Sequence, residues 1–213
     1  MAAGTLASLS NSIFASLSLP GCIDELGIGE SPFKRECLVL IDGMGSLALK
    51  EYGEKFSIFS QAKSKSDLNS IFPTTTTVNL TSLGTGVLPG IHGMLGYTVR
   101  VPRSGEPGRL LNALKWDERV DTLIWQKVPT LFERAQEFGI KTSQISAKRY
   151  ENTGFTRAAL RGATYIGANQ ISDITDEAVR ALKDDNSFAY RSEEHTSELQ
   201  SLAYLVCRLL LEK

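Results

Sequence analysis

Short apolar runs alternate with amphipathic stretches along most of this chain. The clearest run is Cys37–Ile41, which lies between polar neighbours and is typical of a strand buried in a parallel sheet. Apolar residues at helical spacing predict an amphipathic helix over residues 5–17. The same pattern predicts further strands over residues 70–72, 140–146, 163–166 and 187–190, and helices over residues 47–52, 74–83, 130–138, 156–161 and 173–182. Because strands and helices alternate, we expect an α/β fold with a mainly parallel sheet flanked by helices.

Residues 87–121 interrupt this alternation. The stretch holds several glycines and prolines and no long periodic run. It is too long for a plain connector, and loops of that length usually carry a function or a structure of their own.

The composition is that of a globular chain without a strong charge field. The 213 residues are 42% hydrophobic and 22% charged, and the formal net charge is −1. This balance gives neither a basic surface for nucleic acid nor a polybasic segment for a membrane. No apolar run approaches the ~20 residues of a membrane span. Three cysteines at no metal-like spacing argue against a disulfide framework and favour a cytoplasmic location.

Residues 191–213 are a different kind of sequence. The segments Arg-Ser-Glu-Glu-His-Thr-Ser-Glu-Leu-Gln-Ser at 191–201 and Tyr-Leu-Val-Cys-Arg-Leu-Leu-Leu at 204–211 resemble the in-frame translation of a common sequencing adapter. We therefore expect a domain over residues 1–190 and an artefactual tail over residues 191–213, which is excluded from fold reasoning. The alternative is a natural amphipathic helix at the C-terminus, with leucines in a stripe. Without the tail, His92 is the one histidine of the sequence.

A carboxylate stands where the first buried strand ends. In open α/β sheets, ligands bind beyond the carboxyl ends of the strands, and Asp42 follows Ile41 directly. The glycines at 43 and 45 allow a sharp turn, and the carboxylate suits a hard or borderline cation. An Asp-Gly turn after a strand is also common without any such role.

A run of threonines, Thr74–Thr77, opens the helix expected over residues 74–83. A hydroxyl at a helix N-terminus faces free N–H groups and the positive end of the helix dipole, which favours an alkoxide and binds phosphate oxygens. A threonine there is a competent covalent nucleophile, particularly where a cation touches its hydroxyl. On chemistry alone the four threonines are equivalent candidates, and a plain helix cap is the alternative for an isolated run.

The chain resembles the type I phosphodiesterase and nucleotide pyrophosphatase branch of the alkaline-phosphatase superfamily over most of residues 1–190. The segments that carry the resemblance, in order, are Ile41-Asp42-Gly43-Met44-Gly45, Phe72-Pro73-Thr-Thr-Thr76-Thr-Val-Asn79, Leu83-Gly84-Thr85-Gly86 and Pro89-Gly-Ile-His92-Gly93. The resemblance implies an alkaline-phosphatase-like core, incomplete here, and hydrolysis of small phosphodiesters or nucleotides.

The resemblance also implies roles for particular residues. Thr76 is the catalytic nucleophile and a metal ligand, Asn79 contacts the substrate phosphate, and Asp42 is a metal ligand. Leu80 departs from many eukaryotic members, which have histidine there, so substrate fit is expected to differ. Phosphonoacetate hydrolase and phosphomonoesterase are rival activities for the same site.

Four other residues have side chains that could bind a metal or the substrate. His92 is interpreted as a loop anchor rather than a metal ligand, and Tyr97 as a packing residue rather than a platform for a base. Arg157 and Arg161 are interpreted as solvated helix charges, although they could pair with a phosphate.

The family implied by the resemblance uses two divalent metal ions, zinc being the expected metal. Its further ligands, an Asp-x-x-x-His pattern, an Asp-His pair and a last histidine, are not found in the sequence. We therefore expect this chain to be an inactive fragment. The alternative is a non-catalytic phosphate-binding or interaction module that keeps the helix start around Thr76.

Overall fold

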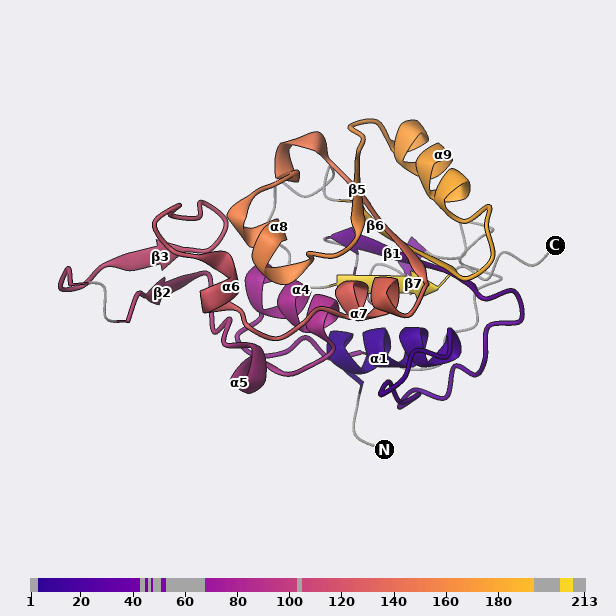
Figure 1. Cartoon of the computed structure of the whole chain (residues 1–213), viewed down its shortest axis with the longest axis horizontal. Coiled ribbons are helices and arrows are strands. Elements are labelled where there is room, and N and C mark those ends of the chain that lie inside the picture. Colours follow the sequence, from indigo (N-terminus) through magenta and orange to yellow (C-terminus); the bar gives the residue numbers. More distant parts are fainter. Residues whose placement is uncertain are drawn as a thin grey trace.

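A five-stranded sheet is the centre of the fold (Figure 1). The computed structural model describes residues 4–42, 45, 47, 51–52, 68–102, 105–193 and 204–208, without the side chains of residues 193 and 204–208. In sheet order the strands are β5 (Thr164–Gly167), β4 (Lys141–Ser146), β6 (Ser187–Glu193), β1 (Arg35–Asp42) and β7 (Tyr204–Arg208). The first four run parallel and β7 is antiparallel to β1. The expected α/β fold with a mainly parallel sheet is confirmed.

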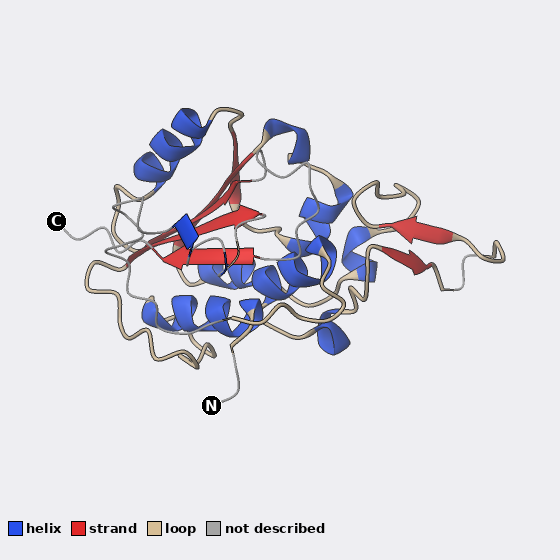
Figure 2. Cartoon of the chain, turned by 180° about the vertical axis from the view of Figure 1, so that it is seen from behind, coloured by secondary structure: helices blue, strands red, loops and turns tan. Residues whose placement is uncertain are grey.

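Helices cover both faces of the sheet (Figure 2). One face carries α1 (Leu6–Ser16), α4 (Thr76–Thr85), α7 (Leu131–Glu137) and α8 (Gly154–Ala159), and the other carries α9 (Ile171–Ala181). Side chains of β1 alternate between the two sides. Leu38 and Leu40 join the core of the four helices, whereas Cys37 and Val39 pack with Ile174 of α9. Burial on both faces explains why this strand is a continuous apolar run.

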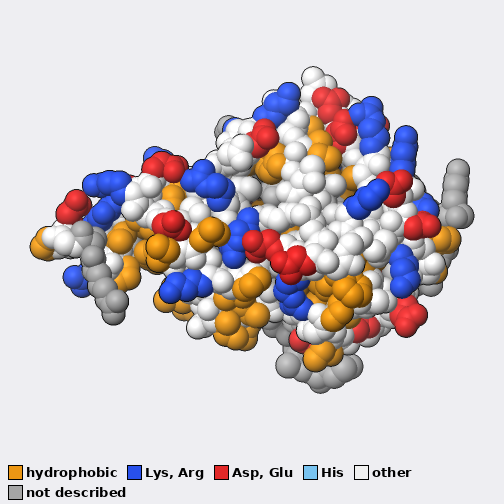
Figure 3. Space-filling view, in the orientation of Figure 1, with side chains coloured by type: hydrophobic (Ala, Val, Ile, Leu, Met, Phe, Trp, Pro, Cys, Tyr) orange, Lys and Arg blue, Asp and Glu red, His pale blue; other side chains and the backbone are white. Residues whose placement is uncertain are grey.

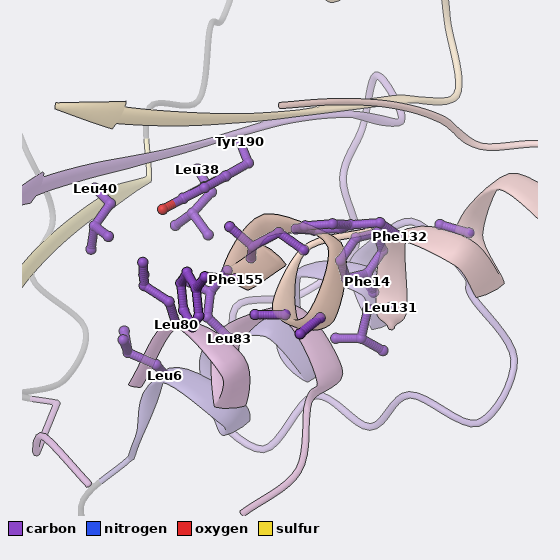
Figure 4. Packing of buried hydrophobic residues seen from close by; sticks show 14 of the residues in the cluster. Leu6, Phe14, Leu38, Leu40, Leu80, Leu83, Leu131, Phe132, Phe155 and Tyr190 are labelled. Carbon is purple, nitrogen blue, oxygen red and sulfur yellow. The ribbon is translucent and has the colours of Figure 1, made fainter. Parts of the chain in front are cut away.

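Aromatic side chains fill the larger core (Figure 4). The Phe14 ring of α1 lies 4.7 Å, centroid to centroid, from the Phe188 ring of β6. Phe132 of α7 lies 5.7 Å from Phe188 and 6.4 Å from Tyr190. All four side chains are buried, and the contacts fix α1 and α7 against the sheet.

The long stretch after α4 has a structure of its own. It forms α5 (Pro89–His92), the hairpin of β2 (Thr98–Arg100) and β3 (Leu110–Asn112), and then α6 (Thr122–Trp125). The hairpin projects from the body of the molecule (Figure 1). Several large apolar side chains of the stretch are exposed, among them Leu88, Ile91, Leu95 and Leu110. Figure 3 shows apolar side chains on the surface at this end of the molecule.

One expected strand is wrong. Residues 70–72 are not in a strand, because the side chain of Asn79 takes the hydrogen-bonding groups that a neighbouring strand would need. The Ile71 N–H donates to Asn79 Oδ1 at 2.9 Å, and Asn79 Nδ2 donates to the Ile71 carbonyl at 3.1 Å. Of the helix expected over residues 47–52, residues 47, 51 and 52 are described and are helical, and the rest lies outside the described residues.

The boundary expected at residue 190 falls inside β6, which continues to Glu193 in register with β1. Residues 204–208 form β7, so the alternative of an amphipathic helix is wrong for that segment. The division into a domain and an artefactual tail stays a prediction. In the described residues, no helix is both long and apolar enough to cross a membrane.

Candidate active site

The carboxyl ends of the parallel strands and the start of α4 border a common pocket of about 240 Å³. We call it the sheet-end pocket. Asp42 lines it from the last position of β1, and Thr76 lines it from the first position of α4. Both are partly exposed. The structure therefore brings together the two residues that the sequence singles out as a metal ligand and a nucleophile, at the strand ends where α/β folds bind ligands.

The start of α4 separates the four threonines. Thr75 is the N-cap, and its hydroxyl accepts from the Val78 N–H at 3.4 Å and lies 3.1 Å from the hydroxyl of Thr77. Thr77 is fully buried. Thr76 is the one member of Thr74–Thr77 that lines the pocket. The local hydrogen bonds thus leave one threonine side chain facing the cavity.

Asn79 lies one turn further along α4 and does not line the sheet-end pocket. It is fully buried, and its amide is bonded to the backbone on either side of the turn that enters the helix. Besides its two bonds to Ile71, Nδ2 donates to the Thr75 carbonyl at 3.1 Å. The amide therefore ties residue 71 to the helix start, and its predicted contact with substrate stays a prediction.

Apolar side chains form another part of the pocket wall. It is built by Leu80 of α4, Leu114, Phe155 of α8 and Leu160, with Leu40 of β1. Figure 4 shows Leu40 and Leu80 on the same side of the sheet as Phe155. Leu80, the position where the resemblance departs from many family members, is thus part of the binding wall. An apolar wall beside a few polar groups is the usual make-up of a small-molecule site.

Several polar residues of the pocket were missed by the sequence analysis, and three of them matter below. Gln144 and Ser146 line it from β4, and Arg149 lines it from the short helix η2 (Lys148–Tyr150) that follows. Gln144 and Ser146 stand at alternate positions of one strand, so they face the same side of the sheet. A signal that could have found Gln144 and Ser146 is their polar character within a strand that the α/β pattern places inside the sheet.

His92 lies away from the sheet-end pocket, at the end of α5. The Met94 N–H donates to its Nδ1 at 3.1 Å, so the ring proton is on Nε2, which donates to Ser82 Oγ at 2.9 Å. The side chain is 2% exposed, and burial lowers the pKa of His92 to about 4. These contacts make it a neutral anchor between α5 and α4, in agreement with the loop-anchor interpretation.

The two helix arginines are bonded to protein groups. Arg161 Nε donates to Glu133 at 3.0 Å, and its other nitrogens donate to the carbonyls of Ala158 and Val128 at 2.7 Å. Arg157 pairs with Glu118 at 2.9 Å. Arg161 is therefore a structural link rather than a solvated charge, because its bonds join α7 to α8. Tyr97 is 41% exposed and does not line the pocket.

The described residues provide only part of a metal site. They contain no group of three His, Cys, Asp or Glu side chains that could hold a metal ion. The carboxylate of Asp42 and the hydroxyl of Thr76 are oxygen donors of the kind that divalent cations take. This pair fits one edge of a cation site, since zinc takes about four ligands, and it does not identify the metal.

A family model described as type I phosphodiesterase / nucleotide pyrophosphatase matches residues 37–199. The match covers more than half of the 213 residues, so the chain belongs to this family. It confirms the resemblance drawn from the four sequence segments, and the parallel sheet is consistent with an alkaline-phosphatase-like core. A search of curated proteins gives no match.

Proposed function

Because the chain belongs to this family, we propose that it is a phosphodiesterase/nucleotide pyrophosphatase-type hydrolase with Thr76 as nucleophile. The observation that carries the proposal is that Thr76, alone among four consecutive threonines, lines the pocket that also contains Asp42. The substrates are small phosphodiesters or nucleotides, in line with the size and apolar wall of the pocket.

The position of Thr76 suits attack on phosphorus. It is the first residue of a ten-residue helix, whose first N–H groups and dipole attract phosphate oxygens. In the proposed reaction, the Thr76 hydroxyl gives up its proton to solvent and its oxygen bonds to phosphorus as the bond to the leaving oxygen breaks. Water then displaces Thr76 from this covalent intermediate, in which the threonine carries the phosphoryl group with its remaining ester substituent, and a proton returns to the threonine oxygen. The helix start stabilises the negative charge that gathers on the phosphoryl oxygens in both steps.

Asn79 is assigned a positioning role in this reaction. Its three hydrogen bonds tie Ile71 and Thr75 together and so fix the turn from which Thr76 projects. Direct contact between Asn79 and the phosphate remains a prediction, and it would require the amide to give up a backbone partner.

Asp42 and Thr76 are the residues we assign to a divalent cation, with zinc the metal that the family resemblance implies. Such a cation, when bound, lowers the pKa of a coordinated hydroxyl and neutralises phosphoryl charge. The proposed cation dependence is supported by the donor chemistry of these two side chains and by family membership.

The test is release of nitrophenol from bis(4-nitrophenyl) phosphate by the purified chain with zinc, manganese or magnesium. Catalysis through Thr76 predicts release that is lost in Thr76→Ala and after chelation, and retained in Thr74→Ala, a threonine outside the pocket, whereas the incomplete set of metal ligands predicts no release by this chain. Mass spectrometry of acid-quenched enzyme should then locate a 4-nitrophenyl phosphoryl group on Thr76. Release that persists in Thr76→Ala would overturn the assignment of the nucleophile.

The same assay tests the prediction that the chain is an inactive fragment. No release with any of the three metals, and no covalent adduct on Thr76, would overturn catalysis by this chain. Phosphate binding that persists without release would then favour the non-catalytic phosphate-binding module.

A further inference from the structure

Two buried polar side chains of the sheet-end pocket have no role in the proposed reaction. Gln144 and Ser146 are each 3% exposed, and both line the pocket. Within the described part of the chain, neither side chain makes a hydrogen bond. Neither is among the fully buried side-chain atoms that lack a partner, so their polar atoms reach the space of the pocket. Convergent polar groups in a pocket wall are the ones that orient a ligand.

The register of the sheet separates these groups from the nucleophile side of the pocket. Gln144 pairs with Tyr190 of β6, and Tyr190 pairs in turn with Leu38 of β1, so β6 lies between β4 and β1. Neighbouring strands are about 4.8 Å apart, which puts the backbone of β4 roughly 10 Å from that of β1. One phosphoryl group held beside Asp42 and Thr76 does not span that distance. Gln144 and Ser146 therefore face a different part of a bound substrate.

Arg149 adds a positive charge to this side of the pocket. Its guanidinium carbon lies 4.8 Å from the ring centroid of Tyr150, and among the described residues no carboxylate lies within ion-pair distance of it. Stacking on Tyr150 holds the cation without neutralising it.

The segment that carries Arg149 is fixed by hydrogen bonds at both ends. The Tyr165 hydroxyl donates to the Ala147 carbonyl at 2.6 Å, and the Lys148 N–H donates to Asn169 Oδ1 at 3.2 Å. At the other end, the Thr156 hydroxyl donates to the Tyr150 carbonyl at 2.8 Å. The loop is thus pre-organised, which reduces the entropy lost when a ligand binds.

We infer that Gln144, Ser146 and Arg149 form a recognition subsite for a second anionic group of the substrate. The inference rests on the proposed function, because the first group is the phosphoryl that Thr76 attacks. Guanidinium, amide and hydroxyl groups all donate hydrogen bonds, and together they match the oxygens of a phosphate or a carboxylate. The subsite selects phosphoesters that carry such a second group over uncharged ones.

Binding of simple probes to the whole chain tests the subsite. The dissociation constants of inorganic phosphate, pyrophosphate and phosphonoacetate are measured by calorimetry with a chelator present, so that metal complexes do not form. Pyrophosphate supplies a phosphate and phosphonoacetate a carboxylate as the second group. The variants are Arg149→Ala, Gln144→Leu with Ser146→Ala, and the control Lys141→Ala, which removes a charge from the other end of β4.

We expect at least one two-group probe to bind more tightly than inorganic phosphate. Arg149→Ala should weaken that probe ~10-fold or more, the value of one charge-assisted hydrogen bond. The Gln144/Ser146 double variant should weaken it as well, and Lys141→Ala should change it less than about twofold. The probe that responds identifies the second group as phosphate or carboxylate.

Several results would overturn the subsite. One is equal affinity of all three probes for the wild-type chain, and another is an Arg149→Ala variant that binds like Lys141→Ala. A third is an equal loss for inorganic phosphate, which would place Arg149 on the reacting phosphoryl group. Thr76→Ala distinguishes failure of the subsite from failure of the proposed function. This variant abolishes the proposed reaction but should keep the preference for the two-group probe.

Discussion

The buried imidazole of His92 should make the stability of the fold depend on pH. In the native chain its pKa is lowered to about 4 by burial, compared with 6.5 for an exposed histidine. The unfolded chain therefore takes up a proton below pH 6.5, while the native chain resists protonation until about pH 4. The contribution is fully present above pH 6.5, falls as the pH drops towards 4, and is constant below that value.

The size of the effect follows from the difference between the two pKa values. A difference of about 2.5 units at 1.36 kcal/mol per unit gives about 3 kcal/mol of unfolding free energy lost between pH 7 and pH 4. The carboxyls of Asp24, Asp117 and Asp184 have lowered pKa values, so their contributions are lost below their ordinary value of 3.8, outside this window. The window from pH 6.5 to 4 therefore isolates His92 among the described groups with shifted values.

The measurement is urea unfolding at pH 7, 6, 5 and 4 for the wild-type chain and for His92→Gln. The glutamine amide can donate to Ser82 Oγ but does not titrate, so the variant should lose about 3 kcal/mol less than wild type over that range. Ser82→Ala is a second control, since it leaves a buried N–H without a partner and should cost about 1–3 kcal/mol at pH 7. Parallel pH curves for wild type and His92→Gln would refute the reasoning.

Three further perturbations test other contacts. Gly84→Ala would put a methyl 2.0 Å from the Ala159 carbonyl and should cost about 2–3 kcal/mol, whereas Gly90→Ala, with nothing within 4 Å, should be nearly neutral; equal urea midpoints would contradict this. Asn79→Leu leaves the Ile71 N–H without its partner and should cost about 3 kcal/mol by urea unfolding, and a cost under ~1 kcal/mol would argue against the backbone link. Burial raises the pKa of Cys37 to about 11, so a thiol reagent should label the partly exposed Cys22 faster than Cys37. Peptide mass spectrometry measures the two rates, and equal rates would contradict the packing.

The elements that the sequence predicts well are those whose pattern is set by how their own side chains are buried. Residues 37–41 are apolar throughout because β1 is buried on both faces, and the alternation of strands and helices is imposed by the parallel sheet. The strand expected at 70–72 failed for the opposite reason. Whether this segment forms a strand depends on the side chain of Asn79, eight positions away, which competes for the backbone groups of Ile71. The hairpin of β2 and β3 was missed because three-residue strands carry too little periodicity.

The site residues also differ in whether local sequence signals are enough to find them. Asp42 and the run Thr74–Thr77 could be located from local signals, namely an apolar run, a glycine turn and a threonine cap, whereas the choice of Thr76 within the run came from the family resemblance. Gln144 could not, since a polar residue within a short strand normally marks its solvent side. The residue becomes informative once β4 is known to lie between β5 and β6 with a helical layer above it, because a polar side chain then has no solvent face to occupy. Gln144 lines the same pocket as Thr76 and Arg149, so we attribute its polarity to what enters the pocket, and the binding measurements on Gln144, Ser146 and Arg149 test that explanation.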